Sequence, residues 1–263
     1  MFILDGKGMK KKRIRHGSLF SGIGGFDLAA DWCGWETVFH CEVDVFCQKI
    51  LHHYWPHAAT IGDIEKHEWK KWRGKIDVLS GGWPCQKYSV AGSRIGSEPL
   101  KEVLLDVVDA VRPAWAVLEN VFGFITKKFA AEHDRLCQRL ETMGYEVQTF
   151  CIDAASCGVP TMERHVWIVA TSTCQRRKRL DKKQIQNITG APLLLPGGDP
   201  GVFDRWALSE SRVCNVGEGV SGRLDIETIR AKVWHAKSLK ALGNAIVPQI
   251  AYYIFSAINE TIN

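Results

Sequence analysis

The chain has 263 residues, of which 46% are hydrophobic and 24% are charged, so we expect one ordinary globular core rather than two full-sized domains. No apolar run approaches the roughly 18 residues that cross a bilayer, so we expect no membrane segment. The net charge of +5 is uneven, with basic clusters at residues 10–15 and 174–184 that either suit a polyanionic partner or are simply solvated surface.

The first residues lack the long apolar stretch and the small-residue cleavage site of a secretory signal, which predicts a cytoplasmic protein. The nine cysteines include no CxxC pair and lie mostly inside apolar segments, as reduced thiols of that compartment do. We assign no metal site to them.

In chain order, apolar runs of strand length alternate with segments of helical period. Strands are predicted just before "SGIGG" (21–25) and at 36–44, 76–82, 114–121, 146–153 and 165–171. Helices are predicted just after "SGIGG" and at 45–55, 100–113, 130–145 and after Pro248. This alternation predicts a doubly wound, mostly parallel α/β sheet of Rossmann-like type.

The composition changes near Thr171, which predicts three regions. Residues 1–171 would form the catalytic and cofactor-binding domain. Residues 172–237 are polar, rich in turn residues and weakly periodic, as in a small separate lobe. Residues 238–263 regain a strongly apolar helix, which we expect to return and pack on the first domain.

Two features favour a nucleotide-like cofactor. The glycine turn "SGIGG" follows a strand and opens a helix, where backbone N–H groups can lie against a ligand; a turn needed only for tight packing is about as common. Glu42 ends the second strand, where a carboxylate can accept hydrogen bonds from a ribose, and Asp63 could do the same for an adenine amino group.

Two reactive side chains also follow neighbouring strands. Cys85 stands in "GGWPCQ" directly after a strand, and Glu119 lies near the end of the apolar strand "AWAVLENV". Glu119 or Asn120 could simply cap the next helix. A thiol and a carboxyl at adjacent strand ends would, however, both face the crevice at the carboxyl edge of such a sheet.

Five segments occur in an order that resembles the motif series of DNA (cytosine-5)-methyltransferases, especially the short phage and prophage forms. These are "LFSGIGGFDLA", "GGWPCQ", "LENV", "CGVP…VWIVA" and "LKALGNAIVPQIA". The resemblance covers residues 17–171 and 238–255. It implies methyl transfer from S-adenosylmethionine to carbon 5 of a cytosine that is rotated out of double-stranded DNA.

The resemblance also implies a role for each matching residue. Cys85 would add to carbon 6 of the ring and Glu119 would hold or protonate nitrogen 3. The cofactor site would be lined by Phe20, Gly22, Ile23, Gly24, Glu42, Asp63, Gly82, Asn244, Ala245 and Ile246. Substrate would be bound by Pro84, Gln86, Ser89 and Asn120 and, through phosphates, by the basic residues Arg176, Arg177, Lys178 and Arg179. We expect a monomer.

The chain departs from the family where two arginines usually follow "CGVP". Here "TMERHVWIV" puts Glu163 and His165 at those positions. His165 could replace an arginine only when it is protonated. Arg164 could serve through a shift of one residue, but on a strand such a shift points to the opposite face.

This departure keeps two alternatives open. One is a homologue with weakened catalysis that binds cofactor or DNA and regulates a partner. The other is a tRNA cytosine-5 methyltransferase, because the same chemistry works on a base splayed out of an RNA loop.

Overall fold

The computed structural model describes residues 13–84, 98–154, 164–173, 237, 241 and 245–262. Within these ranges the strands are β1 (Arg15–Leu19), β2 (Glu36–Cys41), β3 (Ala59–Ile61), β4 (Val78–Gly82), β5 (Trp115–Val121), β6 (Tyr145–Asp153) and β7 (Arg164–Ser172). The helices are α1 (Gly25–Trp32), α2 (Val45–Tyr54), α3 (Glu98–Val111), α4 (Ala130–Thr142) and α8 (Pro248–Ile262), with short 3₁₀ turns η1 (Ile64–Lys66), η2 (Trp69–Trp72) and η3 (Phe122–Ile125).

The strands form one sheet in the order β3-β2-β1-β4-β5-β7-β6. Neighbours from β3 to β5 pair in parallel, whereas β7 pairs antiparallel with both β5 and β6. The predicted doubly wound, mostly parallel sheet is therefore confirmed. From β1 the chain adds β2 and β3 on one side of the sheet and then β4 and β5 on the other side. Such a switch point, here between β1 and β4, opens a crevice at the carboxyl edge of the sheet.

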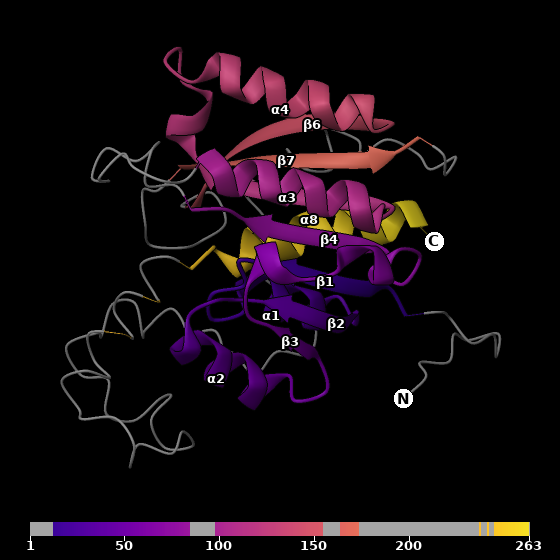
Figure 1. The fold of residues 1–263 in the computed structure, drawn as a ribbon. Helices are drawn as coiled ribbons and strands as arrows, with labels where there is room; N and C mark the ends of the chain where they lie inside the picture. The colour runs from indigo at the N-terminus through magenta and orange to yellow at the C-terminus, as the bar shows by residue number, and fades with distance from the viewer. Residues whose placement is uncertain are drawn as a thin grey trace.

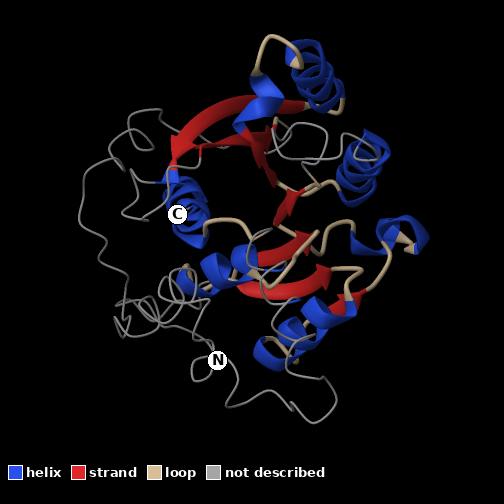
Figure 2. Cartoon of the chain, turned by 90° about the vertical axis from the view of Figure 1, so that its left-hand side faces the viewer, coloured by secondary structure: helices blue, strands red, loops and turns tan. Residues whose placement is uncertain are grey.

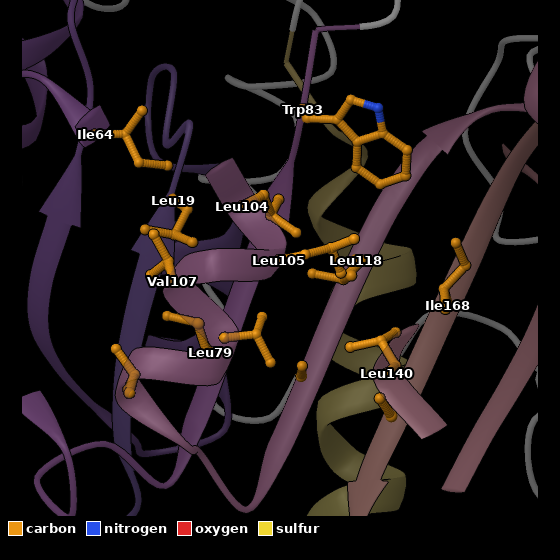
Figure 3. Packing of buried hydrophobic residues seen from close by; sticks show 14 of the residues in the cluster. Leu19, Ile64, Leu79, Trp83, Leu104, Leu105, Val107, Leu118, Leu140 and Ile168 are labelled. Carbon is orange, nitrogen blue, oxygen red and sulfur yellow. The ribbon is translucent and has the colours of Figure 1, made fainter. Parts of the chain in front are cut away.

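Helices cover both faces of the sheet, as the edge-on view in Figure 2 shows. In Figure 1, α3 crosses in front of the sheet and α8 lies behind it. On the α3 face, Leu104 and Leu105 belong to the same buried cluster as Leu79 of β4 and Leu118 of β5, and Figure 3 shows these side chains facing one another. Their burial follows from the helical period of "LKEVLLDVV".

On the opposite face, α8 packs against α1. Phe255 of α8 is fully buried and stacks on Trp35 with ring centroids 4.5 Å apart. The helix begins at Pro248, a residue whose fixed φ and missing N–H suit the first helical position. The C-terminal helix thus lies against the start of the chain's first βα unit. The lobe expected at 172–237 falls almost entirely outside the described residues.

The structure adds elements that the sequence reading did not predict. β3 is a three-residue edge strand with two exposed residues, and η1 and η2 lie between it and β4. The expected third strand is consequently β4. Within the described residues, no helix combines the length and the apolarity needed to cross a membrane.

Candidate active site at the carboxyl edge of the sheet

The backbone conformation of the glycine turn between β1 and α1 requires glycine at two positions. Gly22 and Gly24 have φ values of 55° and 92°, in the left-handed region that favours glycine. A Cβ on Gly24 would lie 2.4 Å from the Trp55 ring, whereas a Cβ on Gly22 would meet no atom within 4 Å. The turn is therefore packed from one side by Trp55 and open beside Gly22. A ligand could approach the backbone there.

Two other turn residues expected to line a cofactor are partly buried by protein. Phe20 packs against the core cluster of the α3 face and has a φ of 50°, which is rare for a residue with a side chain. Ile23 packs against a small cluster that contains Phe46 of α2 and Ala241. Both side chains thus help to hold the turn in place.

Glu42 connects the turn to the end of β2. One carboxylate oxygen accepts a hydrogen bond from the backbone N–H of Gly22 and the other from that of Asp44, both at 2.8 Å. Each oxygen has two lone pairs, so one on each oxygen is left for further donors. A pair of ribose hydroxyls is a suitable donor set.

Asp63 is turned toward its own chain segment. Its Oδ1 accepts from the backbone N–H of Glu65 at 3.0 Å, and its Oδ2 pairs with the Lys66 ammonium at 2.8 Å. The hydrogen bond from Lys66 lowers the pKa of this carboxyl. Asp63 is therefore a charged cap for η1, with less hydrogen-bonding capacity for a ligand than the sequence suggested.

Glu119 forms the centre of the site. It lies near the end of β5, is 7% exposed, and its Oε1 is 2.5 Å from Nδ1 of His165 on β7. Its Oε2 occupies the space over Gly82, where a Cβ would lie only 2.7 Å from that oxygen. Any residue but glycine at position 82 would displace the carboxyl.

The C-terminal segment closes the site from the α1 side. A Cβ on Gly82 would lie 3.4 Å from Cγ2 of Ile246, and one on Gly25 would lie 2.7 Å from Cγ1 of the same side chain. Ile246 thus bridges the start of α1 and the end of β4, as the expected return of this segment requires. Ala245 is half-buried beside it, and Asn244 lies outside the described residues.

Arg164 points away from this centre. It binds Asp153 of β6, with Nε 2.5 Å from Oδ1, and its guanidinium lies 5.0 Å from the Phe122 ring centroid. Because side chains alternate along a strand, His165 and Arg164 occupy opposite faces of β7. Of the two candidates for the missing arginine, the structure brings only His165 to Glu119.

Asn120 acts on the segment that leads to Cys85. It is 1% exposed, its amide donates to the backbone oxygen of Trp83 at 3.1 Å, and its Oδ1 accepts from the N–H of Val121 at 3.0 Å. This tether fixes the backbone next to Pro84, which is half-buried. Asn120 is thus a positioning residue in the described structure, and its tether was not foreseen from the sequence.

The remaining expected residues lie outside the described ranges. They are Cys85, Gln86, Ser89, Asn244, Arg176, Arg177, Lys178 and Arg179. The sequence analysis did not predict the hydrogen bond from the glycine turn to Glu42 or the close fit of Glu119 over Gly82. The spacing of glycines and acids indicated candidate residues, but not that these residues contact one another.

Comparisons with known proteins identify a family. A family model described as C-5 cytosine-specific DNA methylase matches residues 14–191. The orphan methyltransferase M.Rho11sI of Bacillus phage rho11s is 31% identical over 169 residues, which cover 61% of this chain and 33% of that protein. The type II methyltransferase M.AquIA of Picosynechococcus sp. is 34% identical over 181 residues, which cover 61% of this chain and 72% of that protein.

Two solved structures share the fold. A putative DNA modification methyltransferase encoded within an E. coli prophage has a TM-score of 0.65 and 14% identity, covering 95% of this chain and 99% of that one. The S. pombe Dnmt2 methyltransferase has a TM-score of 0.68 and 16% identity, covering 96% and 100%. At such identities the likeness concerns the fold alone.

The family match extends over the sheet, the glycine turn and the Glu119 site. The chain spans about a third of the length of curated relatives such as M.Rho11sI. Because the matched region is more than half of this sequence, the chain belongs to the C-5 cytosine-specific DNA methylase family.

Proposed function

We propose that this protein is an S-adenosylmethionine-dependent DNA (cytosine-5)-methyltransferase. The observation that carries the proposal is the buried carboxyl of Glu119, held by His165 and seated over Gly82, three residues before Cys85. A buried carboxyl beside a strand end that leads directly to a cysteine is suited to polarising a ring while a thiolate attacks it.

Cys85 is the proposed nucleophile. Carbon 5 of cytosine is a poor nucleophile, but a thiolate added at carbon 6 makes carbon 5 behave as an enamine. The addition pushes charge into the ring toward nitrogen 3. Glu119 is proposed to hold or protonate that nitrogen, which stabilises the adduct. After carbon 5 is methylated, a base such as water takes the proton of carbon 5, the electrons of that C–H bond restore the double bond between carbons 5 and 6, and Cys85 leaves as a thiolate.

The residues around the glycine turn fit an adenosine-type cofactor. The open side of Gly22 leaves room for a ligand, and the spare lone pairs of Glu42 supply acceptors beside it. When bound, S-adenosylmethionine supplies an activated methyl group. We propose that Glu42 binds its ribose and that Ile246 helps to complete the cofactor site, with a lesser part for Asp63.

Double-stranded DNA is the proposed substrate. A cytosine stacked in a duplex is out of reach of a thiol and a carboxyl, so we propose that the base rotates out of the duplex toward Glu119. The basic residues at 176–179 are proposed to bind phosphates and so to fix the orientation of the duplex. We propose that the protein acts as a cytoplasmic monomer.

The test is methyl transfer from labelled cofactor to duplex DNA, followed by detection of 5-methylcytosine. A duplex that carries 5-fluorocytosine should trap the protein covalently, because fluorine blocks the loss of the carbon 5 substituent, and Cys85→Ser should abolish the trapped species. Methyl transfer to tRNA but to no DNA would replace the proposed substrate. If neither 5-methylcytosine nor a covalent adduct forms on any nucleic acid, the proposed enzymatic activity is contradicted and a binding role is favoured.

A further inference from the structure

We propose that His165 supplies a proton to Glu119 during the reaction, a role that rests on the proposed function. An arginine at this position could only hold the carboxyl, because its guanidinium does not lose a proton in proteins. An imidazole exchanges its proton near neutral pH. The substitution of histidine for arginine would thus change the chemistry as well as the contact.

The geometry suits direct transfer between the two side chains. Nδ1 of His165 and Oε1 of Glu119 are 2.5 Å apart, and the two side chains are 12% and 9% exposed. His165 faces Val121 across the β5–β7 ladder, so it lies on the same face of the sheet as Glu119, two residues earlier on β5. Partial burial excludes competing water and strengthens the interaction.

The described elements packed against β7 carry other ionisable groups. β6 contributes Asp153, which is paired with Arg164 on the opposite face of β7, and the exposed Cys151. η3, which also packs against β7, has the sequence "FGFI" and adds no ionisable group. Among these described elements, Glu119 of β5 supplies the carboxyl that pairs with the imidazole.

The two oxygens of Glu119 would then have separate tasks. In the proposed reacting state, Glu119 carries a proton on Oε2 and His165 is an imidazolium. As the Cys85 thiolate forms its bond to carbon 6, the proton on Oε2 passes to ring nitrogen 3. The carboxylate left behind takes the Nδ1 proton of His165 at Oε1, so the imidazole becomes neutral. When Cys85 is expelled, nitrogen 3 returns its proton to Oε2 and Oε1 returns its proton to Nδ1. No proton is gained or lost by the pair over a turnover.

The test compares the wild-type protein with His165→Arg and His165→Gln in single-turnover methylation of duplex DNA between about pH 6 and pH 9. Each variant keeps Cys85, so the ratio of rates cancels the ionisation of the thiol. Because a neutral imidazole has no proton to supply, the advantage of wild type over H165Q should decrease as the pH rises. The ratio of the wild-type rate to the H165R rate should also fall as the pH rises.

Ratios that stay constant across the pH range would overturn the proton-supply role. H165Q provides the comparison if the larger arginine prevents folding. Trapping of the wild-type protein on 5-fluorocytosine DNA is measured in parallel. Trapping with flat ratios rejects the role of His165 alone, whereas absence of both trapping and methyl transfer rejects the proposed function and this role together.

Discussion

Gly82 determines where the carboxyl of Glu119 can lie. The residue before it, Gly81, faces the opposite side of the sheet, where a Cβ would lie 3.2 Å from Leu104 and from Leu19. The two adjacent glycines therefore have different roles. Gly82 leaves room for Oε2 of Glu119 on one face of the sheet, and Gly81 leaves room for the packing of α3 on the other.

Gly82→Ala should lower the methylation rate by at least about tenfold, because its Cβ would displace Oε2 of Glu119, and misplacing a catalytic group by about 1 Å costs on the order of a hundredfold. Gly81→Ala is the matched control. It should lower the free energy of unfolding through overpacking, by about 1–3 kcal/mol, with a smaller effect on the rate per folded molecule. Equal rate losses in both variants would contradict the assignment.

Arg164→Ala separates the two neighbouring candidates on β7. The pair with Asp153 is half-exposed on both sides, so its removal should change the free energy of unfolding only slightly. Its effect on the methylation rate should be far smaller than that of His165→Gln. A larger rate loss for Arg164→Ala would show that the sequence alignment with a shift of one residue is the correct one.

The sequence predicted which strand ends carry the candidate residues, but not the contacts among them. Glu119 and His165 could be placed at strand ends, and the alternation of a strand already disfavoured Arg164. The pairing of the Asp63 side chain with Lys66 could not be predicted, because it depends on a short 3₁₀ segment with little periodicity. Contacts such as that of Oε2 with Gly82 depend on the sheet register, which the motif order does not specify.

At the level of elements, the pairing of α1 with α8 positions the site. Residues 245–247 precede α8 and bring Ile246 against Gly25 and Gly82. The long amphipathic helices and buried strands were predictable from period and length. β3 was not, since a strand of three residues at the sheet edge is too short to show a pattern.

Phe255→Ala should destabilise the protein by about 3–5 kcal/mol, because the ring is fully buried against Trp35 and Phe26 and its loss leaves a cavity. Urea unfolding measures the change. The exposed residue Tyr54 of α2 offers a control, and Tyr54→Ala should cost less than about 1 kcal/mol. Similar costs for the two variants would contradict the packing of α8 described above.

For the whole molecule, two fully buried ionisable groups oppose each other in the pH dependence of stability. Burial raises the pKa of Asp27 from 3.8 to about 7 and lowers that of His16 from 6.5 to about 3. Asp27 stabilises the fold most below about pH 3.8, and this contribution is lost as the pH rises to about 7. His16 acts in the reverse sense, because its contribution is complete above about pH 6.5 and is lost as the pH falls toward 3.

Asp27→Asn should therefore remove the pH-dependent contribution of Asp27 to stability and leave that of His16. The free energy of unfolding of wild type minus that of the variant should decline as the pH rises from about 4 to about 7, by roughly 1.4 kcal/mol per pH unit. Urea unfolding of both proteins across this range gives the difference directly. A difference that is independent of pH, or that grows with pH, would contradict the burial of an uncharged carboxyl at this position.

The reversed direction of β7 has a consequence for how this family member can vary. The first residues of β7 meet the Glu119 carboxyl because β7 starts at the edge where its parallel neighbours finish, and two ladders lock it in place. These ladders, and not the residues that precede β7, determine which side chain reaches Glu119. Insertions or deletions within 155–163 should therefore leave His165 beside Glu119, so that differences in length can accumulate before β7 without changing this contact.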